Sequence, residues 1–255
     1  MADSGPIAGI TGAITSWAGT FHGQLLTGQR PQSATLTIDA PSIDTTAFAD
    51  SGIETAIPDL TSWTVSWNAM LATPAHGALG LVTFSGGYVS NLNSFTVNMH
   101  QNEIPVTAFQ ATSNAWIPGT LGWDGNFAGY ADGTTPVVAP GAAAAAAVFR
   151  YQDLATDAEL AGNIFATQLG VTSAPNQAVS VSYSYKGTAG LTSTGTAKAT
   201  NTLAATAASA LVFTASTGRT YSGTAFWTGI SLTCALNQAT LVNVTARGTG
   251  ALTIA

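Results

Sequence analysis

The sequence contains few charged residues. Only 7% of its 255 residues are charged, against roughly 25% in ordinary soluble domains. Twelve acidic and six basic residues give a net charge of −6, and no basic patch is present that would favour sequence-reading contacts to nucleic acid. Charge normally keeps a free monomer soluble, so its depletion indicates a surface largely covered by protein in use. A secreted Ser/Thr-rich domain, soluble through its hydroxyls, is the open alternative.

Cysteine and the usual catalytic signatures are also scarce. Cys234 is the only cysteine, which excludes an internal disulfide and a cysteine-based zinc site. The three histidines, His22, His76 and His100, have no metal-ligand spacing. No nucleophile elbow, phosphate-cradling loop or dinucleotide fingerprint appears. We therefore expect no enzyme activity, no metal and no cofactor.

Long apolar runs are missing as well. No stretch approaches the roughly 20 apolar residues that a membrane-spanning helix needs. The first twelve residues lack a basic segment followed by an apolar run, so they do not predict a signal peptide. We expect no membrane partner.

What the sequence does contain is a repeat. The stretch Gly162–Leu191 is repeated without a gap as Gly223–Leu252, at an offset of 223 − 162 = 61 residues. Where the two copies differ the chemistry is kept, as for Leu169 and Ile230. The identical pairs include Gly162 and Gly223, Phe165 and Phe226, Asn176-Gln177-Ala178 and Asn237-Gln238-Ala239, and Gly187-Thr188 and Gly248-Thr249. A folding unit has therefore been duplicated.

The front of the chain repeats too. Ala34–Ile38 is answered by Phe95–Met99, and the offset is 61 between Phe48 and Phe109 but 60 between Trp63 and Trp123. The order of halves is thus A, A′, B, B′. We expect residues 79–199 to form one continuous unit, inserted into a discontinuous unit made of residues 1–78 plus 200–255. A swapped pairing of front and back halves remains open.

Composition and periodicity predict a mainly β fold. Trp63, Val65 and Trp67 share one face at period two, a strong strand signal. The alanine run 142–147 after Pro140-Gly141 predicts a short helix around 141–147, and a similar alanine-rich segment recurs at 203–208. The aromatic residues expected in the core of the two repeats are Trp63, Trp67, Trp123, Phe127, Phe165 and Phe226.

Two patterns carry a resemblance to a known family. The front pattern runs Ile-Asp-Thr-Thr-Ala-Phe from Ile43 and Ile-Pro-Asp-Leu-Thr-Ser-Trp from Ile57, and it is repeated from Ile104 and Ile117. The back pattern ends in Lys186-Gly187-Thr188, and its copy in Arg247-Gly248-Thr249. Over about residues 13–252 the chain resembles the major tail tube proteins of long-tailed, siphovirus-like bacteriophages.

The resemblance implies two β-sandwich or β-barrel-like tube units, each with a short flanking helix. Such subunits close into rings and stack into the tail tube of the virion, through which DNA is ejected. A ring of six units would need three copies of this two-unit chain, and hence a trimer with pseudo-sixfold symmetry. The implied partners are further copies of the chain, tape measure, tail terminator and baseplate proteins, and DNA as a transient, non-specific cargo. Synthesis would take place in the host cytoplasm.

Acidic residues are candidates for the lining of such a pore. Asp39, Asp44 and Glu103 lie in or just after the A strands, and carboxylates repel DNA phosphates. A solvated outer face is the open alternative for these three residues.

A different class of function is also compatible with the sequence. A duplicated β-sandwich can serve as a binding or decoration module that recognises carbohydrate, or a cell or capsid surface, through exposed aromatic residues. A β-rich hydrolase is the weaker third hypothesis, since no catalytic signature supports it.

Overall fold

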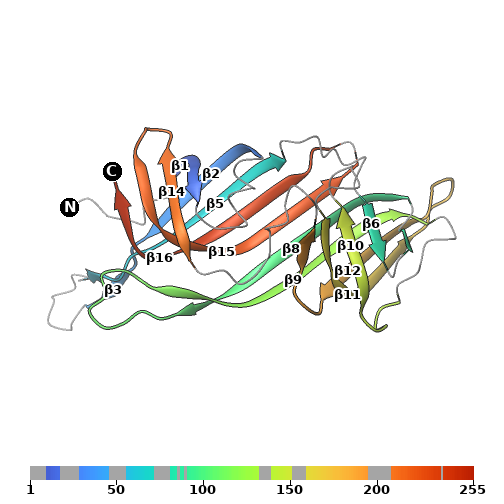
Figure 1. The fold of residues 1–255 in the computed structure, drawn as a ribbon, viewed down its shortest axis with the longest axis horizontal. Helices are drawn as coiled ribbons and strands as arrows, with labels where there is room; N and C mark the ends of the chain where they lie inside the picture. Colours follow the sequence, from blue (N-terminus) through green and yellow to red (C-terminus); the bar gives the residue numbers. More distant parts are fainter. Residues whose placement is uncertain are drawn as a thin grey trace.

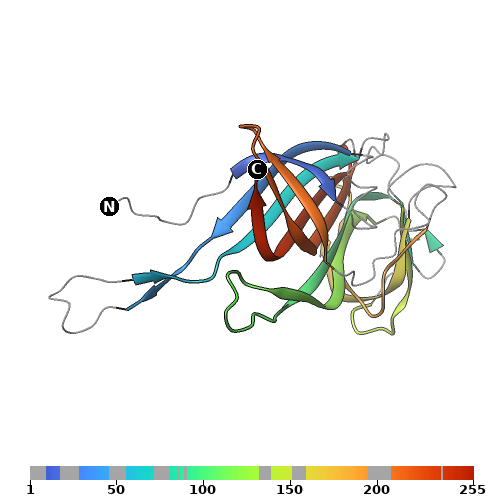
Figure 2. The same ribbon diagram turned by 60° about the vertical axis from the view of Figure 1, so that its left-hand side comes forward.

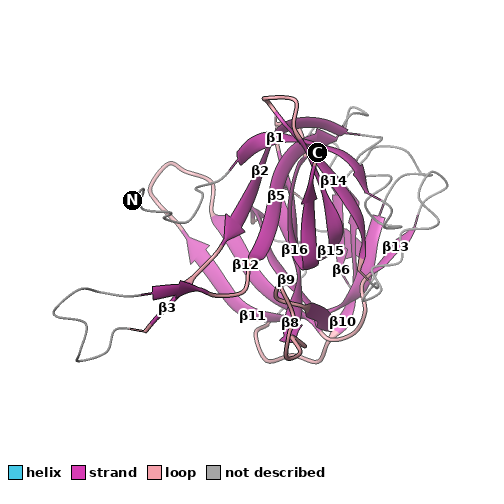
Figure 3. Cartoon of the chain, turned by 90° about the vertical axis from the view of Figure 1, so that its left-hand side faces the viewer, coloured by secondary structure: helices cyan, strands magenta, loops and turns pink. Residues whose placement is uncertain are grey.

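The computed structural model describes residues 10–17, 29–45, 56–71, 81–84, 87–88, 91–131, 139–150, 159–194, 208–236 and 238–255. Every regular element in these ranges is a β-strand, and no helix occurs among them (Figure 3). The period-two pattern explains this result: along one central strand Phe95, Val97 and Met99 are buried, while the residues between them are not. The mainly β class predicted from the sequence is confirmed.

The described residues form sixteen strands. They are β1 (Ile10–Trp17), β2 (Gln29–Asp39), β3 (Ser42–Asp44), β4 (Ala56–Pro58), β5 (Ser62–Leu71), β6 (Leu81–Phe84), β7 (Gly87–Tyr88), β8 (Leu92–Pro105), β9 (Trp116–Tyr130), β10 (Ala145–Arg150), β11 (Glu159–Thr172), β12 (Ser180–Gly187), β13 (Thr192–Thr194), β14 (Ser209–Ala215), β15 (Thr220–Ala235) and β16 (Leu241–Ile254).

Six of these strands close on themselves. β1 pairs with β2, β2 with β5, β5 with β16, β16 with β15, β15 with β14, and β14 returns to β1, always antiparallel. Leu36, Val65, Phe213 and Trp227 are fully or almost fully buried inside this first barrel. A closed barrel removes the sheet edges that an open sheet would expose.

A second set of six strands pairs in a corresponding order. β6 pairs with β10, β10 with β11, β11 with β12, β12 with β9, and β9 with β8. β6 lies beside β8, but in the described part of the chain no ladder joins the two. We call this set of six strands the second barrel, although its β6–β8 seam is not closed by a ladder of described residues. The short strands β7 and β13 are attached to β6 and β11.

One pair of strands joins the two sets. β15 runs on beyond β14 and pairs with β8, from Gly229 opposite His100 to Ala235 opposite Ser94. The sheet therefore continues without a break in the order β2-β5-β16-β15-β8-β9-β12-β11. Figure 1 shows the long strands β5, β16, β15, β8 and β9 side by side on one diagonal.

Glycines of the repeat leave room for two tryptophan rings at matching positions, Trp63 and Trp123. We call each of these glycine–indole contacts a tryptophan–glycine seat. A Cβ added at Gly223 would lie 2.5 Å from Cζ2 of Trp63, and one added at Gly162 would lie 2.5 Å from Cζ2 of Trp123. The indole N–H of Trp63 donates to the Gly250 carbonyl at 3.2 Å. That of Trp123 donates to the Ala189 carbonyl at 2.7 Å, and 250 − 189 is again 61. Both hydrogen bonds and both glycine contacts tie a front half to a back half.

Two hairpins extend beyond the barrels. β3 and β4 form a separate two-stranded sheet that projects from the first barrel (Figure 2). The far end of the β8–β9 hairpin instead packs on the first barrel, where the Trp116 amide donates to Oγ1 of Thr249 at 3.0 Å. The Gly250 amide donates to the Asn114 carbonyl at 3.1 Å.

The helix predicted around residues 141–147 is wrong. Pro140 and Gly141 form a turn, and from Ala145 the chain is strand β10, paired with both β6 and β11. So short a helix is marginal on its own, whereas a strand here satisfies its backbone on two sides and buries Ala147 at 1% exposure. The second expected helix, at 203–208, lies almost entirely outside the described residues.

The expected core aromatics divide into two groups. Trp63, Trp67, Trp123 and Phe127 are buried within the main hydrophobic cluster. Phe165 is not: it is partly exposed and points away from the buried Ile164 and Ala166 on either side of it. The period-two alternation of β11 places it on the opposite face of the sheet. Its partner in the repeat, Phe226, is buried at 1% exposure, but it too lies opposite the inward-facing Ala225 and Trp227.

Candidate functional site

One face of the continuous eight-stranded sheet carries small polar side chains. The cause is strand alternation, which turns the apolar residues into the barrels and the intervening residues outward. On β8, for example, the side chains of Thr96, Asn98 and His100 lie opposite the buried Phe95 and Val97.

The cross-strand registers align these outward residues into rows. The middle row runs, strand by strand, through Ser33, Asn68, Asn243, Ser231, Asn98, Asp124 and Lys186. The row on one side runs through Thr35, Ser66, Thr245, Gly229 and His100. The row on the other side runs through Thr233, Thr96, Asn126, Ser184 and Gln168. We call these three rows the polar face.

Hydrogen bonds link neighbours along the middle row. Ser33 Oγ donates to Asn68 Oδ1 at 2.7 Å, and Ser231 Oγ donates to Asn98 Oδ1 at 2.8 Å. Asn98 Nδ2 in turn donates to Asp124 Oδ1 at 3.2 Å. The second of these bonds crosses the junction between β15 and β8, and the third continues the row into β9, so the face is organised as one surface.

Opposite charges lie next to each other on the polar face. Asp124 is the direct cross-strand partner of Lys186, and its Oδ2 lies 3.7 Å from Nδ1 of His100. Opposite charges on facing strands attract. The face therefore offers phosphate no concentrated positive site, and it carries little net charge.

The three acids predicted from the sequence do not gather in one place. Asp39 is exposed at the end of β2, on the same side as Thr35. Asp44 is exposed on β3, in the projecting hairpin. Glu103 lies on β8, where its Oε2 is 3.7 Å from Nε of Arg247. Only Asp39 adjoins the polar face without a cation beside it in the described structure.

The far end of the β8–β9 hairpin bounds the face. Arg247 stacks over the Trp116 ring, with its Cζ 4.4 Å from the ring centroid, and pairs with Glu103 of the same hairpin. Phe226 is the cross-strand partner of Arg247, so it lies on the side of the sheet that this hairpin covers. That cover accounts for its burial.

Beneath the polar face, a tyrosine on β12 forms a hydrogen bond to β8 across the second barrel. The Tyr185 hydroxyl donates to the Thr96 carbonyl at 2.8 Å. Burial raises the pKa of Tyr185 well above its usual value, and the Asp124 carboxylate adds to the shift. The phenol is thus held in its neutral, donating form. Burial likewise raises the pKa of the Cys234 thiol, which keeps this cysteine unreactive.

The sheet ends, on the β11 side, in an unpaired strand edge. β10 pairs with β11 only from Glu159 to Ile164. Beyond that point, as far as Thr172, the same edge of β11 has no strand partner within the described ranges. Val171 in this segment is 61% exposed. Open edges of this kind readily accept another strand.

Sequence reasoning missed both the polar face and this edge. The signal for the face was the alternation of Ser, Thr and Asn with apolar residues, which was used only to infer strands. The repeat pairs Lys186 with Arg247, but no local pattern indicates that Asp124 is the cross-strand partner of Lys186. The edge carries no local signal, since only the strand order reveals it.

The described residues hold no group of three or more metal-ligating side chains. They also contain no helix long and apolar enough to cross a membrane. A scan against protein-family models and a search of curated proteins found no match to this chain.

Proposed function

We propose that the chain is a structural subunit that closes into rings and stacks into a tube of the bacteriophage tail type, the conduit for DNA ejection in the virion. The observation that carries this proposal is the polar face, which runs unbroken over two barrels and ends at an open strand edge. Such a sheet can pair edge to edge with the sheet of a neighbouring copy of the chain. This pairing would remove the free edges and leave one continuous wall lined mainly by hydroxyls and amides.

The proposal includes an internal duplication, with one unit at 79–199 inserted in another formed by 1–78 plus 200–255. The matching strand orders and the two tryptophan–glycine seats support it. So do the register shifts, which fall at Ala166/Gln168 on β11 and at Trp227/Gly229 on β15, again 61 residues apart. Among the described residues, the β15–β8 ladder is the only ladder across this division, and one isolated bridge joins Thr61 to Ser113.

A duplicated chain fits a ring of three copies. Each copy supplies two barrels, so three copies supply six and give pseudo-sixfold symmetry. The low charge of the chain agrees with a subunit whose sides are largely covered in the assembly.

The polar face suits a lumen that DNA must cross without binding. Affinity for DNA comes mostly from lysine and arginine contacts to phosphate. On this face Lys186 stands beside Asp124 and Phe165, and the other members of the rows are hydroxyls, amides, Gly229 and His100, which lies next to Asp124. Asp39 at the margin of the face would add repulsion. Asp44 and Glu103 lie on the hairpins.

The hairpins provide candidate contacts between stacked rings. Ile43 and Ile57 face each other across β3–β4 and are 46% and 52% exposed. Ile104 and Ile117 face each other across β8–β9 and are 45% and 46% exposed. Exposed apolar pairs on slender hairpins favour contact with protein, either the next ring or, at the tube ends, the tape measure, tail terminator and baseplate proteins.

Sedimentation velocity and negative-stain microscopy of the purified chain test this proposal. We expect a trimer of 3 × 25.7 = 77.1 kDa, and rings or tubes about 100 Å across, as estimated from six small domains side by side. A chain that stays monomeric at high concentration would refute it.

Glycan binding by such a monomer would favour the alternative of a carbohydrate-binding or decoration module. Phe109 and Tyr130, which are exposed, are the aromatic residues that such a module would use. Against it, Trp63, Trp67, Trp123 and Trp227 are buried, and Trp116 is covered by Arg247.

A further inference from the structure

The two long strands β15 and β11 have the same surroundings up to one point. β15 pairs with β14 as far as Ala225 and then, from Gly229 onward, with β8. β11 pairs with β10 as far as Ile164, but its following segment, Gln168–Thr172, has no strand on that side in the described part of the chain. The second barrel therefore lacks the neighbour that the first barrel has.

Side-chain exposure records the same difference. On β15, where β8 covers the edge, Ile230 and Leu232 are 2% and 5% exposed. On β11 the corresponding residues, 61 positions earlier, are Leu169, which is partly buried, and Val171, which is 61% exposed. Burial of apolar surface would stabilise a strand placed beside them.

We propose that the open edge of β11 binds β2 of a second copy of this chain, antiparallel and in the register that β8 adopts on β15. This inference rests on the proposed self-assembly and specifies its interface. β2 is the strand that corresponds to β8, since Ala34 and Leu36 are buried as Phe95 and Val97 are, and 95 − 34 is 61.

The register between β11 and β2 of the second copy follows from the β15–β8 ladder when 61 is subtracted from each residue number. Gly229 opposite His100 becomes Gln168 opposite Asp39 of the second copy. Ser231 opposite Asn98 becomes Gly170 opposite Thr37, and Leu232 opposite Val97 becomes Val171 opposite Leu36. The polar face then continues from one copy into the next.

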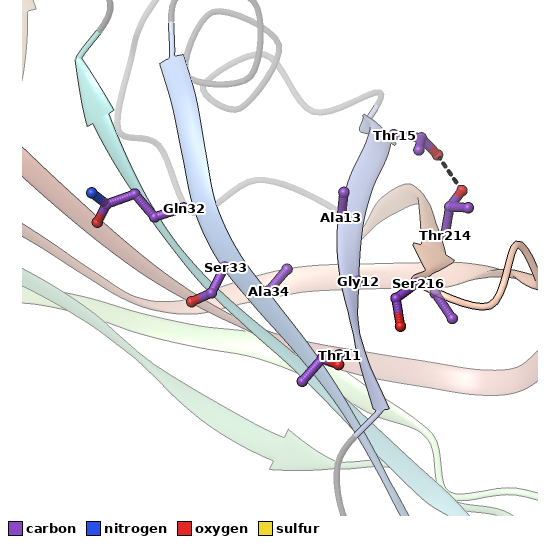
Figure 4. Close-up of a pocket in the computed structure, with 10 residues that line it drawn as sticks. Thr11, Gly12, Ala13, Thr15, Gln32, Ser33, Ala34, Thr214 and Ser216 are labelled. Atoms are coloured by element: carbon purple, nitrogen blue, oxygen red, sulfur yellow. Dashed lines mark hydrogen bonds between the residues drawn. The ribbon is translucent and has the colours of Figure 1, made fainter.

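In the free chain another strand occupies part of this edge of β2. Ile10, Thr11 and Gly12 of β1 pair with Leu36, Thr35 and Ala34. β1 then diverges from β2 and leaves an open groove of about 490 Å³ between them (Figure 4). In the second barrel the equivalent seam lies between β6 and β8; the described residues form no ladder there, and β8 pairs with β15 instead. The same edge of the strand can therefore pair either with the first strand of its own barrel, as β2 does with β1, or with a strand of another barrel, as β8 does with β15.

Assembly therefore exchanges three pairs of β1 with β2 for the seven pairs seen in the β15–β8 ladder. The rest of β1 stays in place, because Gly12 to Trp17 also pair with β14. Before assembly, the first residues of β1 occupy this edge of β2 and prevent it from pairing with another chain. They are displaced when β11 of a second copy binds.

Cysteine cross-linking tests the register. The internal counterpart of Thr37 and Gly170 is the hydrogen-bonded pair Asn98 and Ser231, so the two side chains lie within reach. Under oxidation we expect Thr37→Cys/Gly170→Cys to form covalent dimers and trimers, at least tenfold above either single variant. The two-residue-shifted pair Thr37→Cys/Thr172→Cys is the matched control and should remain near the single variants. The native Cys234 is buried and is present in every sample.

A reversible lock tests the exchange. A disulfide in Thr11→Cys/Thr35→Cys would fix β1 to β2, so the oxidised protein should lose the 77.1 kDa species, and reduction should restore it. The matched control, Ala13→Cys/Thr214→Cys, fixes β1 to β14 and should assemble in both states.

The outcomes separate this inference from the proposed function. Rings that form without the in-register cross-link, or that form with β1 locked to β2, would overturn the inference and leave the function standing. Efficient cross-linking of Gly170→Cys alone would overturn it in favour of a symmetric β11–β11 dimer. A chain that never associates would refute both.

Discussion

At the scale of the residue, glycine and tryptophan give the two copies of the repeat the same packing contact. Gly187 and Gly248 lie within strands, not in a turn, and the indole rings of Trp123 and Trp63 occupy the space where a Cβ would stand. Glycine in a strand commonly marks such a close approach. Each seat fixes how a front half packs on a back half.

These tryptophan–glycine contacts predict that one added methyl group substantially lowers the free energy of unfolding. Gly248→Ala should destabilise the protein by about 1–3 kcal/mol, because the new Cβ overlaps with the Trp63 ring in a close-packed core. The matched control is Gly190→Ala, where a Cβ meets nothing within 4 Å, and it should stay within about 0.5 kcal/mol of wild type. Urea unfolding measures both, and equal stabilities for the two variants would contradict the seat.

Tyr185 predicts the alkaline behaviour of the fold. Its folded-state pKa is raised, mainly by burial, so the folded protein keeps a proton that the unfolded chain releases above about pH 10. The stability from this neutral phenol is fully present below that pH and is lost as the pH rises further.

Tyr185→Phe tests this. At pH 7 the variant should be less stable by about 1 kcal/mol, since the hydrogen bond to the Thr96 carbonyl is lost. Between pH 10 and pH 11.5 its unfolding free energy should fall less steeply than that of wild type. A residual slope is expected, because burial also raises the pKa of Tyr183. Identical slopes would refute the assignment to Tyr185.

At the scale of the element, the sequence predicted strands where alternation was strong and failed where composition alone was used. Trp63, Val65 and Trp67 alternate and are buried as expected. The alanine run was judged by helix propensity, a weak prior that packing between β6 and β11 overrides. Phe165 and Phe226 are both expected in the core from the repeat, yet both point outward, and only Phe226 has a hairpin over it. Contacts between distant elements decide such cases, and local patterns do not contain them.

β10 offers a direct test of strand against helix. Ala146 is exposed within β10, so Ala146→Val should raise the stability by a few tenths of a kcal/mol, because β-branched residues favour strands. In a helix the same change would lower it by roughly 0.5 kcal/mol. Ala143→Val, in the exposed segment before the strand, is the control and should change little. Thermal unfolding of the three proteins settles the sign.

At the scale of the whole molecule, one strand pairing turns two barrels into a single surface. The β15–β8 ladder aligns the outward residues of both barrels, and the hydrogen bond from Ser231 to Asn98 crosses the line where they meet. A duplicated unit with separate barrels would not need this alignment. The repeat was visible in the sequence, whereas the junction was not, since β15 and β8 lie more than a hundred residues apart.

The neutral polar face predicts how DNA affinity responds to added charge. Ser66→Lys/Asn126→Lys/Ser182→Lys places three cations at exposed positions of β5, β9 and β12; Ser66 and Asn126 belong to the polar face, and Ser182 adjoins it two residues before Ser184, on the same side of β12. Wild type should show no measurable affinity for a labelled DNA duplex, while the variant should bind it and lose affinity steeply with salt. The control Ala146→Lys/Ala210→Lys/Thr217→Lys adds the same charge at exposed positions on β10, β14 and the β14–β15 turn, outside the face. It should bind far more weakly in fluorescence anisotropy, because its cations do not line one continuous surface. Equal binding by the two variants would mean that net charge alone, and not the polar face, keeps DNA from adhering.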